Sequence, residues 1–185
     1  MDVKTLCIGI LSLGDASGYE IKKQLEDRFS YFYDASFGSI YPALNKLQKE
    51  GLVTCYHENQ SNRPDKKVYH LTSEGRLELL QELNEEPAAD RVRSEFLVVM
   101  VFSQLLSTGR ISELIDQRIS ETKDCIANIE RLQELHGGDP TNEFVAGFGL
   151  AIHRAAVNYL EENRHLVEGQ ALLAQLERDR STGNG

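Results

Sequence analysis

The chain has 185 residues, a formal net charge of −9, 41% hydrophobic residues and 26% charged residues, which is ordinary for a globular protein of one or two domains. Its longest apolar run, Phe96–Phe102, has seven residues, whereas a membrane span needs about 20, so the composition excludes a membrane protein. Three Cys are too few for a disulfide framework or a tetrahedral zinc site, and the N-terminus lacks the basic segment of a signal peptide, so we expect a reduced, cytoplasmic protein without metal or cofactor.

Two helices are predicted at the start of the chain. Apolar residues that recur every three to four positions predict the first helix over Val3–Leu13. Ser17 and Glu20 have the spacing of a capping box, in which each side chain accepts a hydrogen bond from the backbone N–H of the other residue. This spacing predicts a second helix over Gly18–Phe29.

A third helix is predicted before Gly51. Either Ser36 or Ser39 can cap its start, and Pro42 favours the later one, because a proline is tolerated only in the first turn of a helix. The helix ends at Glu50, where the following glycine stops it. Its expected buried stripe is Ile40, Leu44 and Leu47.

A β-hairpin with a basic tip is predicted next. Its strands are Leu52–Tyr56 and Lys66–Leu71, and the turn 59–65 between them is rich in Asn, Pro and Asp. The cations at the tip are Arg63, Lys66 and Lys67. A fourth helix is predicted after Thr72 or Ser73 and through Glu86.

The second half of the chain is predicted to be helical throughout. Ser94–Leu106 is apolar on nearly every side, so we expect a helix buried on several sides. Two long apolar stripes follow, over Ile111–Ile129 and Val145–Tyr159, and each indicates a helix that seeks a partner. The polar residues 179–185 are predicted to form a disordered tail.

Three helices, a basic hairpin and a fourth helix within about 85 residues form the layout of a winged helix-turn-helix. Residues 36–76 carry six Lys and Arg against four Asp and Glu, although the whole chain is acidic. An acidic protein can bind DNA when such a segment forms one face, because cations near phosphates release counterions. The predicted fold is therefore mainly α with a small β-hairpin, with a winged helix-turn-helix domain over 1–86 and a helical dimerisation domain over 88–178.

Three stretches of the first domain closely resemble the PadR family of transcriptional regulators. The stretches are Leu13-Gly14-x-x-x-Gly18-Tyr19-Glu20-Ile21, Gly38-Ser39-Ile40-Tyr41-Pro42-Ala43-Leu44-x-x-Leu47-x-x-x-Gly51-Leu52-Val53 and Lys67-x-Tyr69-x-Leu71-Thr72-x-x-Gly75. The resemblance is strong over residues 3–85, and the combination of motifs is specific. The helical second half resembles, in layout only, the longer PadR subfamily, whose C-terminal helices form a homodimer and often a ligand pocket.

The resemblance implies DNA contacts at the matching positions. Tyr19 and Lys22 would face the DNA backbone from the second helix. The residues that open the third helix, the recognition helix, would be Ser36, Gly38, Ser39 and Tyr41, with Asn45 and Lys46 one turn further along. Arg63, Lys66 and Lys67 would form the wing. For Tyr41, packing on the wing is the alternative interpretation, and for Lys46 a solvated pair with Glu50.

We expect the second domain to form the homodimer through its apolar stripes. The candidate dimerisation residues are Ile111, Ile115, Ile119, Ile126, Ile129, Phe148 and Ile152. A small apolar or aromatic effector is a further hypothesis, based partly on the family and partly on the aromatic residues of this half, where a carboxylate could meet a His or Arg. The candidate effector residues are Phe96, Phe144, His153, Arg154 and Tyr159. Most of these aromatic residues could equally belong to the core.

The sequence therefore predicts a homodimeric transcriptional regulator that binds an operator in double-stranded DNA, represses transcription and is released by a small aromatic ligand. No hydrolase elbow, phosphate-binding glycine loop or paired-carboxylate motif appears, so we expect no enzyme. The alternative is a protein-interaction adaptor that kept the winged fold and lost DNA binding, which the charge of −9 would favour. The spacings between His136, His153 and His165 do not indicate a metal site.

Overall fold

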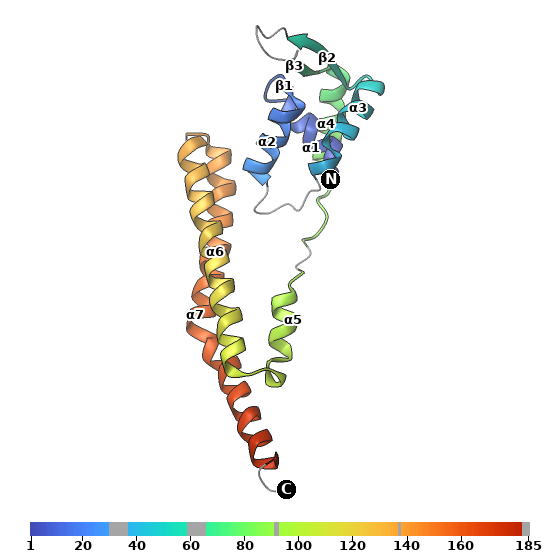
Figure 1. Ribbon diagram of the computed structural model, residues 1–185. Helices are drawn as coiled ribbons and strands as arrows, with labels where there is room; N and C mark the ends of the chain where they lie inside the picture. The colour runs from blue at the N-terminus through green and yellow to red at the C-terminus, as the bar shows by residue number, and fades with distance from the viewer. Residues whose placement is uncertain (30–36, 59–65, 91–92, 137, 183–185) are drawn as a thin grey trace. The chain divides into compact units, whose positions relative to one another are not determined.

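The computed structural model describes residues 1–29, 37–58, 66–90, 93–136 and 138–182 (Figure 1). The chain divides into two compact units, Met1–Ala89 and Asp90–Gly185. This division lies within a few residues of the boundary between the expected domains over 1–86 and 88–178.

The first unit contains four α-helices and a small antiparallel sheet. The helices are α1 (Val3–Leu11), α2 (Gly18–Phe29), α3 (Ile40–Lys49) and α4 (Ser73–Asn84), and a turn of 3-10 helix, η1 (Phe37–Ser39), precedes α3. The strands are β1 (Ala16–Ser17), β2 (Val53–Glu58) and β3 (Lys66–Leu71), in the order β1-β3-β2. The helices and the β2–β3 hairpin confirm the predicted fold class.

Local signals set the helix ends of this unit. The α2 helix has the predicted bounds, whereas α1 ends two residues earlier than expected. The amide of Ser12 donates to the carbonyl of Ile8 at 2.9 Å, and the chain then turns and leaves Leu13 exposed. The α3 helix is followed by Gly51, whose φ of 75° is left-handed, as a glycine stop requires.

The core of the first unit lies between α1, α2, α3 and the sheet. Its fully buried side chains include Cys7, Ile8, Ile21, Leu25, Ile40, Leu44, Leu47 and Val53. Cys7 is therefore a core residue, and burial raises the pKa of its thiol to about 12.

The sequence prediction missed one strand. Ala16 and Ser17 pair with Tyr69 and Val68, so the hairpin becomes a three-stranded sheet. Two residues are too short to show the alternation that marks a strand. The pairing joins the start of α2 to the hairpin.

The second unit is helical. It contains α5 (Glu95–Val101), a 3-10 turn η2 (Ser103–Leu105), and two long helices, α6 (Thr108–His136) and α7 (Pro140–Thr182). Figure 1 shows α6 and α7 running side by side, with α7 continuing beyond the N-terminal end of α6. The prediction of a disordered tail is wrong for residues 179–182, which continue α7 and include neither Gly nor Pro.

The predicted helix over Ser94–Leu106 also needs correction. The helix proper ends at Val101, and the residues after it form the 3-10 turn. We expected burial on several sides, but Leu97, Val98, Val101 and Phe102 are exposed in the single chain. Only one side of α5, with Phe96 and Met100, packs against the core of the unit.

The core of the second unit is formed within one chain. Ile111, Ile115 and Ile119 of α6 pack with Val157 and Ala171 of α7. Among the residues that the structure describes, no helix is long and apolar enough to cross a membrane.

Candidate nucleic-acid interface

The α3 helix has two faces of opposite character. Ile40, Leu44 and Leu47 are completely buried. The opposite face exposes Tyr41, Asn45 and Lys46, and 53% of the surface of Tyr41 is accessible. The predicted recognition helix is therefore held by its apolar stripe, while the polar side chains that could reach base edges remain open.

The residues that open α3 form the turn η1. Ser39 stands at the N-cap of α3, with φ −88° and ψ 0°. Among the residues that the structure describes, and apart from its two chain neighbours, none lies within 4 Å of a Cβ atom added to Gly38. Ser36, the other predicted residue of this turn, lies outside the described residues.

The N-terminal end of α2 is capped as predicted. The backbone N–H of Ser17 donates to Oε2 of Glu20 at 2.9 Å, and the N–H of Glu20 donates to the Ser17 hydroxyl at 3.3 Å. Lys66 of β3 reaches the same carboxylate, with Nζ 2.7 Å from Oε1. The Lys66 ammonium and the Ser17 N–H hold the pKa of Glu20 at about 2.

Two tyrosines lie at this end of the domain. Tyr19, in the first turn of α2, is 69% exposed. The ring of Tyr41 lies against Gly18, the residue next to Tyr19 in the chain. Lys22, one turn further along α2, is exposed and lies 3.5 Å from the carboxylate of Glu26. The structure thus places Tyr41 of α3 against the start of α2, the helix that carries Tyr19 and Lys22.

The wing strand β3 contributes two cations with different surroundings. Lys66 is tied to Glu20, so its charge is partly neutralised within the chain. Lys67 donates to Oε1 of Gln48 at 3.2 Å, and its Nζ lies 4.8 Å from the centre of the Tyr69 ring. No carboxylate is recorded against Lys67 in the described part of the domain. Arg63, the third predicted cation of the wing, lies outside the described residues.

Sequence reasoning missed two residues that link these elements. Gln48 of α3 donates to the Sγ of Cys55 in β2 and accepts from Lys67 in β3, so it joins the recognition helix to both long strands. Asp15, before β1, lies 2.7 Å from Nδ1 of His70 and accepts from the Tyr56 hydroxyl at 3.4 Å. Neither residue belongs to a local motif, because its partners come from distant positions in the chain.

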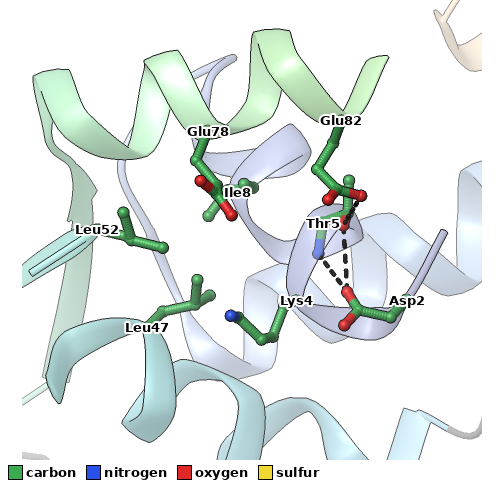
Figure 2. A pocket seen from close by; sticks show the side chains of 8 residues that line it. All are labelled: Asp2, Lys4, Thr5, Ile8, Leu47, Leu52, Glu78 and Glu82. Carbon is green, nitrogen blue, oxygen red and sulfur yellow. Dashed lines mark hydrogen bonds between the residues drawn. The ribbon is translucent and has the colours of Figure 1, made fainter. Parts of the chain in front are cut away.

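A small pocket lies in the first unit, between α1, α3 and α4 (Figure 2). Its volume of about 40 Å³ is far below the roughly 300 Å³ of a typical ligand site. Thr5 closes one end by donating to Asp2, with Glu82 beside it at 3.4 Å. The other lining residues are Lys4, Ile8, Leu47, Leu52 and Glu78. This pocket is part of the packing of the domain, and it holds none of the predicted effector residues.

The candidate dimerisation residues separate into two groups. Ile111, Ile115, Ile119 and Ile129 are buried by side chains of the same chain, so the expectation that they face a second copy is wrong for them. The apolar stripe of α6 packs against α7 of the same chain. From the sequence we expected this stripe to face a second copy. Ile126 is half-buried, whereas Phe148 and Ile152 of α7 are 62% and 53% exposed.

The candidate effector residues do not form a single cluster. Phe144 and Tyr159 are exposed, whereas Phe96 packs against the core of the second unit. Arg154 is already paired, with Nη2 2.6 Å from Oε1 of Glu130.

His153 is the other candidate for an anionic head group. Its Nε2 lies 3.5 Å from the Sγ of Cys125. Burial, and to a smaller extent the charge of Arg118, lowers the pKa of His153, and burial raises the pKa of the Cys125 thiol. Both shifts favour the neutral forms, so His153 does not offer the positive charge that we expected. Within the described ranges, no three His, Cys, Asp or Glu residues lie close enough to hold a metal ion.

Comparison with known proteins gives consistent matches to one family. Residues 7–81 match the sequence profile of the transcriptional regulator PadR-like family. The crystal structure of the PadR-like transcriptional regulator BC1756 from Bacillus cereus has a TM-score of 0.79 to this chain and is 32% identical, covering 89% of this chain and 94% of that one.

The negative transcriptional regulator PadR of Bacillus subtilis (strain 168) is 27% identical over 183 residues, which are 96% of this chain and 98% of that protein. Its crystal structure in complex with operator DNA has a TM-score of 0.76 and covers 89% of this chain and 98% of that one. Its structure in complex with p-coumaric acid is 26% identical, has a TM-score of 0.67 and covers 90% and 97% of the two chains. Because the similarity extends through both units, the chain belongs to the PadR-like family of transcriptional regulators, which are not enzymes.

Proposed function

We propose that the chain binds a double-stranded DNA operator as a homodimer and represses transcription. The observation that carries the proposal is the exposed face of α3, where Tyr41, Asn45 and Lys46 are open while the opposite face is fully buried. The exposed Tyr19 and the wing cation Lys67 lie on elements that contact this helix or its neighbours. Such a protein works where the DNA is, in the cytoplasm.

Binding of this kind needs no net positive charge on the whole molecule. Counterion release depends on the few cations that lie near phosphates, and base contacts then give sequence preference. We assign phosphate contacts to Lys22, Lys67 and the wing residue Arg63, and base contacts to Ser39 and Asn45. The acidic residues of the second unit are no obstacle if they lie away from the DNA.

We assign dimerisation to the second unit, with the DNA-binding domain over 1–86 and the dimerisation domain over 88–178. The chain alone leaves a series of large apolar side chains exposed on α7, including Phe144, Phe148, Ile152 and Tyr159. Their spacing of four, four and seven residues places them on one face of the helix, and an exposed apolar face of this kind marks an interface. An isologous dimer would cover it and would match the two half-sites of a palindromic operator.

A mobility-shift titration at stated salt, with a duplex from the promoter region of the chain's own gene and a random duplex, tests the proposal. We expect a specific shift with the promoter and a weaker one with random DNA. The protein-interaction adaptor predicts no shift with either duplex, even at low salt, and the capture of a protein partner instead.

We further propose that a small aromatic acid releases the DNA, as the p-coumaric acid complex of the Bacillus subtilis relative suggests. In this chain Arg154 is the remaining cation among the predicted effector residues, because burial favours neutral His153. A carboxylate would have to replace Glu130 as the partner of Arg154.

A further inference from the structure

The first turn of α3 touches the first residue of α2 at a point where a side chain cannot fit. A Cβ atom added to Gly18 would lie 2.6 Å from Cε1 of Tyr41 and 3.3 Å from Cδ1 and Cζ of the same ring. Carbon atoms that are not bonded to each other prefer separations of about 3.5–4.0 Å. The ring of Tyr41 therefore occupies the space that any side chain at position 18 would need.

We infer that Gly18 is a positioning residue for DNA binding, which seats the ring of Tyr41 against the N-terminal end of α2. The inference rests on the proposed function, because Tyr41 is one of the exposed residues at the start of the recognition helix. Because position 18 has no Cβ, the ring of Tyr41 lies against the first residue of α2, next in the chain to the exposed Tyr19.

Backbone conformation does not explain the glycine. Within the described ranges, the glycines with positive φ are Gly14, Gly51 and Gly138, and Gly18 is not among them. An alanine could adopt the backbone of Gly18, and it would favour the helix that starts there. The three atoms nearest to the added Cβ all belong to the ring of Tyr41.

Because the obstacle is a partly exposed side chain, a substitution at position 18 should lower the affinity for DNA rather than the stability of the fold. About half of Tyr41 is exposed, at 53%, so its ring can rotate towards solvent without opening the core. A methyl group at position 18 therefore displaces Tyr41 and leaves the domain folded. The loss falls on the contact that Tyr41 makes with DNA.

The test is a double-mutant cycle in the full-length protein with Gly18→Ala, Tyr41→Ala and the double variant. The probe is a duplex that the wild-type protein selects from a random library, titrated at one salt concentration. We expect Gly18→Ala to weaken binding about tenfold, the size of one lost hydrogen bond to a charged group. In the Tyr41→Ala background the same substitution should change binding less than about twofold, because the ring is absent.

Gly9→Ala is the matched control, since no described residue outside the local helix backbone lies within 4 Å of a Cβ at that position. It should bind DNA as the wild type does. The thermal midpoint of Gly18→Ala without DNA should lie within about 4 °C of the wild type. If it falls further, Tyr41→Ala must restore it, because removal of the ring removes the clash.

Three results would overturn the inference: wild-type affinity of Gly18→Ala, losses that simply multiply in the double variant, or unchanged NMR resonances of the Tyr41 ring in Gly18→Ala. If the wild-type protein selects no duplex, both the proposed function and this inference are wrong. If the wild-type protein binds DNA and Gly18→Ala binds it equally well, only the inference about Gly18 is wrong.

Discussion

Nζ of Lys66 lies 2.7 Å from Oε1 of Glu20, while the other oxygen of that carboxylate accepts the backbone N–H of Ser17 at 2.9 Å. One carboxylate therefore caps α2 and also holds the wing strand β3 against it. The pairing of Ser17 with Val68 ties the same two elements through the backbone. Lys66 therefore has a structural role in the free chain, in addition to the phosphate contact that its position in the sequence predicts.

The first prediction concerns the stability of the first unit. Glu20→Gln keeps an acceptor for the Ser17 N–H but removes the ion pair, so we expect a loss of about 0.5–1 kcal/mol at pH 7, as for a partly exposed pair. Glu20→Ala removes the cap as well and should cost about 1–2 kcal/mol. Urea unfolding of the full chain measures both differences. Glu26→Gln, which removes the more distant pair with Lys22, is the matched control and should cost less.

The pH dependence of that difference has a definite sign. The folded-state pKa of Glu20, about 2, is below its ordinary value of 4.5, so the contribution is complete above pH 4.5 and is lost as the pH falls towards 2. The difference between wild type and Glu20→Gln should therefore decrease as the pH falls below 4.5. A difference that stays constant from pH 7 to pH 3 would contradict the assignment of the low pKa to Glu20.

The second prediction separates the two wing lysines. Lys67→Ala should weaken binding to operator and random DNA alike and lower the slope of log affinity against log salt by about 1. Lys66→Ala should lower the slope less, since Glu20 already neutralises that charge. Lys123→Ala, which removes one charge from α6, is the control and should leave the slope unchanged. Equal slopes for Lys67→Ala and the wild type would show that Lys67 does not contact phosphate.

The third prediction uses a second close approach of a glycine. A Cβ added to Gly75 in α4 would overlap the backbone carbonyl of Leu52 and the side chain of Leu71. That carbonyl also accepts from Thr72, so it cannot move freely. Gly75→Ala should therefore destabilise the protein by about 1–3 kcal/mol, whereas Gly9→Ala, in open space, should stabilise it by up to about 1 kcal/mol. Thermal unfolding of both variants compares the two sites, and equal midpoints would contradict the contact.

Local signals in the sequence predicted the first unit well. The capping box of Ser17 and Glu20 gave α2 its observed bounds, and the Ile40, Leu44 and Leu47 stripe identified the buried face of α3. What the sequence could not show depends on partners far along the chain. The hydrogen bond between Glu20 and Lys66 joins residues 46 positions apart, and no local sequence pattern predicts it.

The second unit shows the same limit in a different form. An apolar stripe indicates that a helix face is covered, but it does not identify the element that covers it. The isoleucines of α6 are covered by α7 of the same chain. The prediction that Ile111 and Ile115 meet a second copy failed for this reason. Phe148 and Ile152, which the sequence also proposed, remain candidates because they are exposed in the folded chain.

The fourth prediction tests the proposed dimer surface. Phe148→Glu places a charge in the exposed apolar face of α7, so it should dissociate the dimer while each chain remains folded, because the side chain is 62% exposed within one chain. Sedimentation equilibrium measures the change in mass. Ala127→Glu adds the same charge at an exposed position of α6 and should leave the dimer intact. A dimer of unchanged stability in Phe148→Glu would place the interface elsewhere.

The last prediction concerns the aromatic acid. A ligand that favours the state without DNA by 100-fold contributes about 2.7 kcal/mol, and it lowers operator affinity by up to the same factor. Reciprocity then requires operator DNA to weaken ligand binding equally. Titration of p-coumaric acid by calorimetry, with and without the operator duplex, measures both affinities, and equal values would show that the acid does not act as an inducer.

The ion pair between Arg154 and Glu130 identifies the group that should hold the carboxylate. If Arg154 binds the acid, Glu130 competes with it at 2.6 Å, so Glu130→Gln should tighten p-coumaric acid binding and Arg154→Gln should weaken it. Lys123→Gln, which breaks another pair between α6 and α7, should change neither affinity. Opposite effects of the first two variants cannot arise from a general loss of α6–α7 packing, since that loss would weaken binding in both. Weakened binding in both variants would therefore contradict Arg154 as the anchor of the carboxylate.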